Sequence, residues 1–193
     1  CGVCQLVCPC DAIEMMPSLD GEIRLYNLPS RCFTTAQLTM GRGNSGLLVT
    51  KVKQTLLEAA QPDSLVILDG SPGIGCPVIA SLNGADMALV AAEPSISGFS
   101  DMQRILKTAQ LNCVPAVVCV NKADLHPEYH HKIAQYCKRH HIAYVGSIPY
   151  DEEVMTLVNQ GKSITQAQGP IKARIYQVYQ QTMQHFYSNT KGE

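Results

Sequence analysis

The residues from Asp69 to Gly75 have the types and spacing for phosphate chemistry. They read Asp-Gly-Ser-Pro-Gly-Ile-Gly and directly follow four apolar residues, 65–68. In nucleotide-hydrolysing α/β proteins, an Asp at the end of a buried strand lies near Mg²⁺, and a Pro-Gly turn brings a backbone N–H near the γ-phosphate. We therefore expect Asp69 to be catalytic and to bind the nucleotide together with Pro72 and Gly73. No G-x-x-x-x-G-K-[ST] segment occurs in the chain, so it lacks the loop that would cradle the phosphates.

A second group that could do chemistry is the cysteine run at the start of the chain. Cys1, Cys4 and Cys8 are spaced C-x2-C-x3-C and are followed by a proline, which matches the last three-quarters of the bacterial ferredoxin run. This spacing predicts 4Fe-4S ligands, with the final cysteine reaching a different cluster, so both ligand sets are incomplete here. A structural zinc site or unpaired thiols are the alternative, but zinc pairs normally have a longer spacer. Cys10 and Cys32 lie nearby without a recognised spacing.

Polar residues follow each apolar run farther along the chain. Ligands of parallel α/β sheets bind beyond the C-terminal ends of the strands, so we expect these residues to form one rim. The Asn121 amide offers a donor and an acceptor to a purine edge, and Asp124 completes an N-K-x-D similar to the guanine motif of small GTPases. The motif leaves guanine and adenine open, and we expect Asp124 to face away and cap the helix that begins near His126. The rim is expected to comprise Asp69, Glu93-Pro94-Ser95, Asn121 to Asp124 and Pro149-Tyr150-Asp151, with Pro149 and Asp151 among the nucleotide-binding residues.

The hydrophobic pattern predicts the scaffold that would position these candidates. Apolar runs of four to six residues alternate with single helical segments, which implies right-handed βαβ crossovers and a parallel sheet with helices on both faces. The predicted fold class is α/β. The expected strands are 65–68, 87–92, 116–120 and 144–148, with an alternating strand at 21–26, and the expected helices are 46–60, 77–82, 98–111, 126–141, 152–160 and 171–186.

Composition narrows the classes of function. The chain carries 15 Lys and Arg against 16 Asp and Glu, a formal net charge of −1, so we expect no nucleic-acid partner. Nine cysteines fit a reducing compartment better than a disulfide framework, and we expect a cytoplasmic protein without a signal peptide or stable membrane insertion. Because the chain begins inside the ferredoxin run, we expect a fragment whose first cysteine and phosphate loop lie upstream. A complete protein that has lost both is the alternative.

The other reactive side chains are expected to be structural. Two His-His pairs, at 130–131 and 140–141, fall on one expected helix and favour solvated surface over a metal site. Cys76, at the start of a helix, favours capping and packing over redox chemistry. Three cysteines in apolar patterns are expected core thiols: Cys113, Cys119 and Cys137. An apolar stripe on the C-terminal helix predicts core packing rather than membrane docking: Ile171, Ile175, Tyr179, Met183 and Phe186.

Together, these segments resemble one family, the MinD-superfamily P-loop ATPases that carry an inserted ferredoxin domain. The resemblance is most specific over residues 67–86, covers nearly the whole chain, and agrees with the cysteine run. The other matching segments are Asn44-Ser45-Gly46, Glu93-Pro94, Ser97-Gly98, Val120-Asn121-Lys122 and Ile148 to Asp151.

The resemblance implies an organisation for the chain. Residues 1–30 would be the C-terminal part of a ferredoxin-like 4Fe-4S domain, and residues 31–193 a MinD-like domain with a P-loop NTPase-like sheet that lacks its phosphate-loop unit. It also implies ATP with Mg²⁺ rather than GTP, Asn121 on the adenine with the Pro149 loop beside it, and a homodimer that encloses the nucleotide. The lysine of the family's phosphate loop has no matching position here, so ATPase activity is expected only of the full-length protein.

Three functions remain open at this point. The first is an ATP-driven switch that presents an iron–sulfur domain to a redox or metal-cofactor partner protein, in cofactor handling or electron transfer. The second is an iron–sulfur electron-transfer protein whose α/β part binds nucleotide without hydrolysing it. The third is a GTPase of the N-K-x-D type. Competition between ATP and GTP separates the third from the others, and a lysine-containing phosphate loop upstream would favour the first.

Overall fold

The computed structural model describes residues 2–16, 18–43 and 45–190, and the protein is α/β, as the sequence predicts. Contacts within the chain group it into two compact units, Cys1–Leu68 and Asp69–Glu193, and each is described by itself. The predicted domain boundary at residue 30 was based on sequence resemblance, whereas the division after Leu68 is based on contacts within the chain. It therefore stays a prediction.

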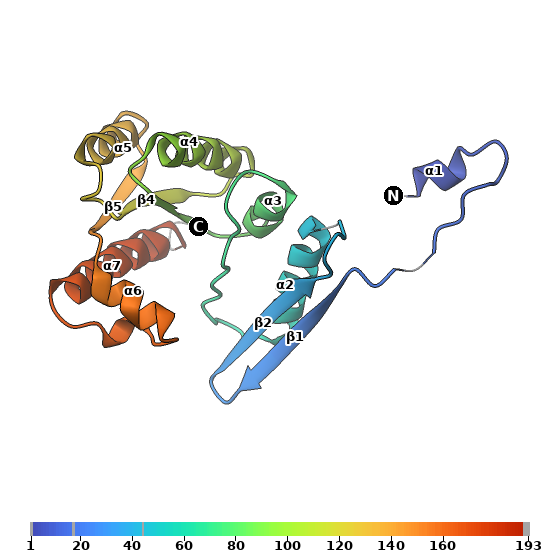
Figure 1. Cartoon of the computed structure of the whole chain (residues 1–193), viewed down its shortest axis with the longest axis horizontal. Helices are drawn as coiled ribbons and strands as arrows, with labels where there is room; N and C mark the ends of the chain where they lie inside the picture. Colours follow the sequence, from blue (N-terminus) through green and yellow to red (C-terminus); the bar gives the residue numbers. More distant parts are fainter. Residues whose placement is uncertain (1, 17, 44, 191–193) are drawn as a thin grey trace. The chain divides into compact units, whose positions relative to one another are not determined.

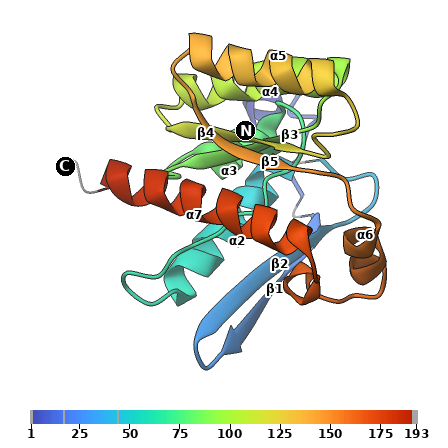
Figure 2. The same cartoon turned by 90° about the vertical axis from the view of Figure 1, so that its left-hand side faces the viewer.

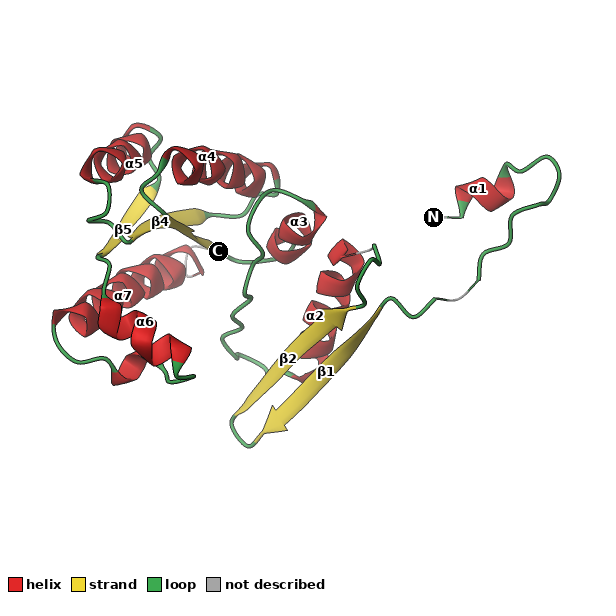
Figure 3. Cartoon of the chain, in the orientation of Figure 1, coloured by secondary structure: helices red, strands yellow, loops and turns green. Residues whose placement is uncertain are grey.

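The first unit contains a β-hairpin covered by a helix (Figures 1 and 3). Its elements are α1 (Val3–Leu6), β1 (Gly21–Leu28), β2 (Arg31–Leu38) and α2 (Ser45–Ala59). The two strands pair antiparallel, and α2 packs on both. Ile23 is half-buried between the exposed Glu22 and Arg24, so the hairpin has a covered face and a solvent face. The strand predicted at 21–26 and the helix predicted at 46–60 are confirmed, whereas β2 was not predicted.

The strand predicted at residues 65–68 is wrong. Residues 61–68 form no strand, and the side chains of Leu65 and Ile67 are 49% and 80% exposed. A buried parallel strand forms only where a neighbouring strand satisfies its backbone N–H and C=O groups, and no strand among the described residues pairs with this segment. The apolar pattern shows that these side chains are suited to burial, but it does not show whether a partner strand is present.

The second unit is built around a three-stranded parallel sheet. Its elements are α3 (Cys76–Leu82), β3 (Ala88–Ala92), α4 (Ile96–Leu111), β4 (Ala116–Asn121), α5 (Pro127–Arg139), β5 (Ala143–Ile148), α6 (Glu152–Asn159), a 3-10 turn (Ile164–Gln166) and α7 (Pro170–Thr190). β4 lies between β3 and β5, and one helix makes each connection. Figure 2 shows α4 and α5 on one face of the sheet and α7 on the other. The three strands and their connecting helices are thus confirmed.

β4 is buried on both faces, which explains why its sequence is apolar without alternation. Val118, which is fully buried, belongs to a cluster with Met102 of α4 and Ile133 of α5. Val117 belongs to a second cluster on the other face, with Val178 of α7. Packing on both faces holds β4 in place, and it therefore positions the polar residues that follow this strand.

β5 carries one residue more than β4 along their paired length. Tyr144 pairs with Val118 and the next pair joins Gly146 to Cys119, so Val145 has no partner of its own. Gly146 has φ +123°, a conformation that side-chain-bearing residues rarely adopt, and a Cβ there would lie 3.2 Å from a valine methyl group of α7. The sequence therefore places a β-bulge where α7 approaches closely.

α7 packs through a face close to the predicted one but not identical to it. Ile171 is buried and Ile175 half-buried, as predicted, but Tyr179 is 53% exposed. Val178 and Thr182 take the buried positions instead, because spacings of four, three and four residues keep one helical face toward the sheet. No helix of residues 2–16, 18–43 and 45–190 is both long and apolar enough to span a bilayer.

Two of the three expected core thiols are buried. Cys119 and Cys137 lie in the two cores, and burial raises the pKa of both, that of Cys137 to about 11. The expectation for Cys113 is wrong, because this residue is exposed. It occupies the turn after α4 with φ 56°, and its side chain is exposed although an apolar run begins at the next residue, Val114.

The expectation of solvated histidines holds for three of the four on α5 and the turn after it. His131, His140 and His141 are exposed. His130 is half-buried, and its Nε2 lies 2.8 Å from the hydroxyl oxygen of Tyr144. This histidine therefore links α5 to β5 through a polar contact that a helical pattern alone does not reveal.

Candidate functional site

The C-terminal ends of three parallel strands lie at one edge of the sheet. Ala92 of β3 pairs with Val120 of β4, and Asn121 pairs with Ile148 of β5. The residues that follow the three strands therefore begin next to one another, at the same edge of the sheet. The structure thus brings together three of the four predicted strand ends, which begin at Glu93, Asn121 and Pro149.

An ion pair joins the first two of these strand ends. The Nζ atom of Lys122 lies 2.6 Å from Oε1 of Glu93, and the two side chains are 36% and 54% exposed. Lys122 has φ 53°, a left-handed conformation that turns the chain sharply after β4. Sequence reasoning missed this pair, because nothing in a local pattern links residues in different loops.

Asn121 is partly held by its own turn. Its Oδ1 accepts a hydrogen bond of 3.1 Å from the backbone N–H of Lys122, and the residue is half-buried. An amide oxygen can accept a second hydrogen bond, and the amide nitrogen carries two donors. Asn121 therefore has the capacity to contact a purine edge from a fixed position at the end of the central strand.

Asp124 does not have the predicted capping role. Its Oδ1 accepts a hydrogen bond of 2.6 Å from the backbone N–H of Tyr150, in the loop that follows β5. α5 begins at Pro127 with His126 at the N-cap position and no side-chain capping bond. Asp124 lies two residues before that N-cap, whereas an N-cap side chain bonds the N–H groups two or three residues after it. The carboxylate instead bridges two strand-end loops.

Asp151 and Pro149 lie in the third loop. The Asp151 carboxylate caps α6, because its Oδ1 accepts hydrogen bonds of 2.8 Å and 3.3 Å from the backbone N–H groups of Glu153 and Val154. Pro149 is half-buried between β5 and this cap. The cap holds the start of α6 at the strand-end edge, and the predicted nucleotide-binding roles of both residues stay predictions.

The Asp69 segment has a different character. Residues 69–75 form no strand or helix, and Asp69, Pro72 and Gly73 are all exposed. Gly73 has φ 94°, which fits the predicted Pro-Gly turn. The catalytic role of Asp69 and the nucleotide-binding roles of Pro72 and Gly73 stay predictions.

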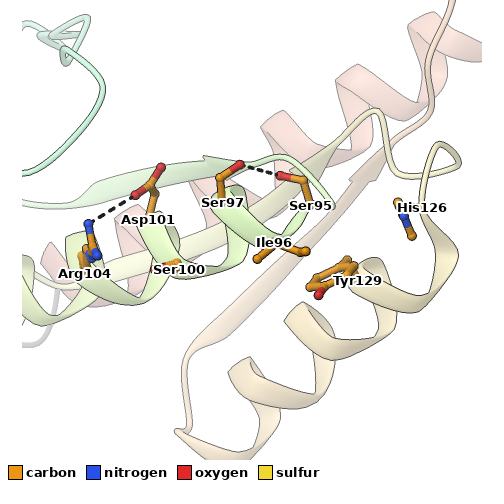
Figure 4. Close-up of a pocket in the computed structure, with 8 residues that line it drawn as sticks. All are labelled: Ser95, Ile96, Ser97, Ser100, Asp101, Arg104, His126 and Tyr129. Carbon is orange, nitrogen blue, oxygen red and sulfur yellow. Dashed lines mark hydrogen bonds and ion pairs between the residues drawn. The ribbon is translucent and has the colours of Figure 1, made fainter.

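A shallow groove of about 710 Å³ lies between the N-terminal half of α4 and the start of α5 (Figure 4). Ser95 caps α4, since its Oγ accepts a hydrogen bond of 2.9 Å from the backbone N–H of Gly98. Of the residues that line this groove, the sequence placed only Ser95 on the predicted rim. The residues that line it are Ser95, Ile96, Ser97, Ser100, Asp101, Arg104, His126 and Tyr129.

Cys8 lies among backbone N–H groups. Its Sγ accepts a hydrogen bond of 3.3 Å from the backbone N–H of Ala12. The backbone N–H of Cys10, followed by that of Ala12, lowers the pKa of the Cys8 thiol below its ordinary value. A thiol whose charged form is favoured in this way is suited to bind metal, because the thiolate is the ligand.

The described cysteines fit part of an iron–sulfur ligand set. Cys4 on α1 is exposed and Cys8 half-buried, whereas Cys1 lies outside the described residues. A 4Fe-4S cluster takes four thiolates, and residues 2–16, 18–43 and 45–190 contain no group of three or more potential metal ligands. Cys4 and Cys8 supply thiol donors, and the role of Cys1, Cys4 and Cys8 as 4Fe-4S ligands stays a prediction.

Comparison with known proteins finds distant homologues and no family. No protein-family model matches the chain. The uncharacterized protein MJ0578 of Methanocaldococcus jannaschii is 27% identical over 145 residues, which are 75% of this chain and 48% of the relative. The uncharacterized protein MJ0579 of the same organism is 27% identical over 139 residues, 68% of this chain and 45% of the relative. The chain thus spans about half the length of both relatives, whose names state no activity.

Proposed function

We propose that this chain is part of an ATP-binding, MinD-like switch coupled to a ferredoxin-type iron–sulfur domain. The observation that carries the proposal is the gathering of polar groups at the C-terminal ends of three parallel strands, with Asn121 held at the end of the central strand. In open α/β sheets this edge is where ligands bind. The side-chain amide of Asn121 supplies both the donor and the acceptor that a purine edge requires.

Each residue has a part in this proposal. Asn121 contacts the adenine, and the loop with Pro149 and Asp151 lies beside the base. Asp69 acts near Mg²⁺, while Pro72 and Gly73 carry backbone groups near the terminal phosphate. Nucleotide binding closes a homodimer in the cytoplasm, and the iron–sulfur domain is presented to a redox or metal-cofactor partner protein. Support for these roles is the sequence resemblance together with the shared strand-end edge.

The test is titration of the protein encoded by the complete gene with ATP and Mg²⁺. Asn121→Ala should weaken ATP binding by about 1 to 3 kcal/mol, the cost of leaving a buried partner without its hydrogen bond. The matched control is Asn112→Ala, because Asn112 donates a hydrogen bond of 2.8 Å to Thr108 at the other end of α4, away from the strand-end edge. Equal ATP affinity in the wild type and Asn121→Ala would contradict the proposed role of Asn121.

A second candidate is an iron–sulfur electron-transfer protein in which the α/β unit is a non-hydrolysing scaffold. The observation that favours it is the set of backbone N–H groups around Cys8. Anaerobic reconstitution of the complete gene product with iron and sulfide, followed by absorption and electron paramagnetic resonance spectra, tests it. A cluster that forms in the wild type but is lost in Cys8→Ser, together with no ATP binding, would favour this candidate over the first.

The GTPase alternative needs a carboxylate that reads guanine, and the N-K-x-D sequence supplies one in Asp124. The contact between Asp124 and the Tyr150 N–H weighs against it, because that carboxylate is already engaged. Competition between ATP and GTP for the complete gene product separates the two. Binding of GTP with no binding of ATP would replace the proposed function with the GTPase.

A further inference from the structure

One hydrogen bond connects the loops that follow β4 and β5. The Oδ1 atom of Asp124 lies 2.6 Å from the backbone nitrogen of Tyr150, a residue 26 positions later in the chain. A bond from a backbone N–H to an ionised carboxylate is about twice as strong as one between neutral groups. The N–H of Tyr150 points in a direction set by its peptide plane, and Oδ1 of Asp124 must lie along that direction. The bond therefore constrains both loops.

The other charged side chain of the same segment is also engaged with a neighbouring loop. Lys122 pairs with Glu93 after β3, as Asp124 bonds to Tyr150 after β5. The two charged residues of the N-K-x-D sequence thus reach in opposite directions along the strand-end edge. Asn121, the last residue of β4, carries two amide N–H donors, and its own turn fixes the orientation of the amide.

We propose that Asp124 is a positioning residue that holds the loop of Pro149 and Tyr150 beside the nucleotide base and thereby favours adenine over guanine. This inference rests on the proposed nucleotide-binding function. Recognition of guanine by a carboxylate uses both oxygens, which accept from the N1–H and the N2 amino group. An Asp124 side chain whose Oδ1 is bound to the Tyr150 N–H cannot present both oxygens to a base without breaking that bond.

Two variants separate positioning from direct reading of the base. Asp124→Asn keeps an oxygen that accepts from the Tyr150 N–H, whereas Asp124→Ala removes it. Asp124→Asn should therefore retain the nucleotide preference of the wild type. Asp124→Ala should speed hydrogen exchange of the Tyr150 amide and reduce ATP affinity by about tenfold with little change in GTP affinity, so that the preference for ATP over GTP narrows.

The experiment measures Tyr150 amide exchange by NMR and titrates the complete gene product and both variants with ATP, GTP and XTP in the presence of Mg²⁺. Glu128→Gln, which breaks an exposed ion pair with Lys132 on α5, is the matched control for the loss of one acidic side chain. Retained ATP preference in Asp124→Asn, with weaker ATP binding, a narrower preference for ATP over GTP and faster Tyr150 exchange in Asp124→Ala, supports the inference. Thermal unfolding of each variant shows that the comparison is made on folded protein.

Other outcomes overturn it. If Asp124→Asn loses GTP binding and gains XTP binding, Asp124 reads the base directly, because xanthine carries an oxygen where guanine carries an amino group. If Asp124→Ala exchanges faster at Tyr150 but binds ATP as tightly as the wild type, the bond exists without positioning the base site, and this inference alone fails. If the wild type binds neither ATP nor GTP, the proposed function fails, whatever the exchange rate at Tyr150.

Discussion

The ammonium group of Lys122 and the carboxylate of Glu93 lie 2.6 Å apart and connect the ends of two neighbouring parallel strands. The contact is short, but both side chains are substantially exposed, at 36% and 54%. Solvent and salt screen such pairs, and their contribution to stability is small. The pair therefore serves to orient two loops more than to hold the fold together.

Glu93→Gln should accordingly lower the free energy of unfolding by less than about 1 kcal/mol, and the difference should shrink at high salt. Urea denaturation at low and high ionic strength measures it. Glu128→Gln, which breaks an exposed pair of 2.7 Å within α5, is the control and should behave alike. A loss above about 2 kcal/mol that persists at high salt would contradict the view of a screened surface pair.

Gly98 is expected to be intolerant of a side chain. A Cβ at this position would overlap the carbonyl oxygen of Glu93, because the first turn of α4 passes directly over the loop after β3. Gly98→Ala should destabilise the protein by about 1 to 3 kcal/mol, since α4 must shift to relieve the overlap. Gly70→Ala is the control, as a Cβ there would meet no atom within 4 Å. Similar unfolding midpoints for the two variants in urea would show that α4 can move away from the Glu93 carbonyl oxygen at little cost in stability.

The buried thiol of Cys137 predicts a loss of stability at high pH. Burial raises its pKa from 9.0 to about 11, so the folded state keeps the proton after the unfolded chain has released it. This contribution is fully present below pH 9.0 and is lost as the pH rises through about 11, by an amount on the order of 2 to 3 kcal/mol.

The measurement for Cys137 is the unfolding free energy across this range in the wild type and in Cys137→Ala. Lysines and tyrosines also titrate there, so the difference between the two pH slopes is the quantity of interest. Cys113→Ala, which removes an exposed thiol, is the control and should leave the slope unchanged. Parallel slopes for the wild type and Cys137→Ala would mean that the buried thiol ionises as readily as in the unfolded chain.

The thiol of Cys8 should show the opposite behaviour. Backbone N–H groups, with that of Cys10 first, favour its thiolate and lower its pKa from 9.0. The alkylation rate of Cys8, followed by mass spectrometry across a pH series, should therefore reach half its maximum at lower pH in the folded protein than in urea. The same residue in the unfolded chain is its own control. Coincident profiles would show that the loop does not stabilise the thiolate.

The sequence predicted the elements whose signal is local. β3 and β4 are almost continuous apolar runs, and β5 is largely apolar. α4 and α5 have helical periodicity with a serine or a proline at their starts, so the type and order of these elements could be predicted directly. β2 was missed because its apolar residues, at positions 32, 33, 36 and 38, do not alternate regularly with polar ones. Residues 65–68 gave the converse error, since an apolar run alone does not guarantee a paired strand.

The candidate site divides in the same way. The topology of a parallel sheet was sufficient to place Asn121 and the loop of Pro149 at one edge. The partners of Lys122 and Asp124 could not be predicted, because they depend on how loops from different strands meet. The expectation that Asp124 caps α5 failed for this reason: a local role was assigned to a side chain whose partner is 26 residues away.

The unpaired residue in β5 changes the phase of that strand. Tyr144 pairs with Val118, and Ser147 pairs with Val120. Val118 and Val120 are two positions apart and share one face of β4, whereas their partners are three positions apart along β5. Removing a paired residue beyond this bulge, such as Ser147, with the earlier pairs kept in place, would advance everything after it by about 3.3 Å and turn each following side chain to the other face. The Tyr150 amide would then miss the Asp124 carboxylate. The length of β5, and not only its composition, is therefore part of what brings the two loops into register.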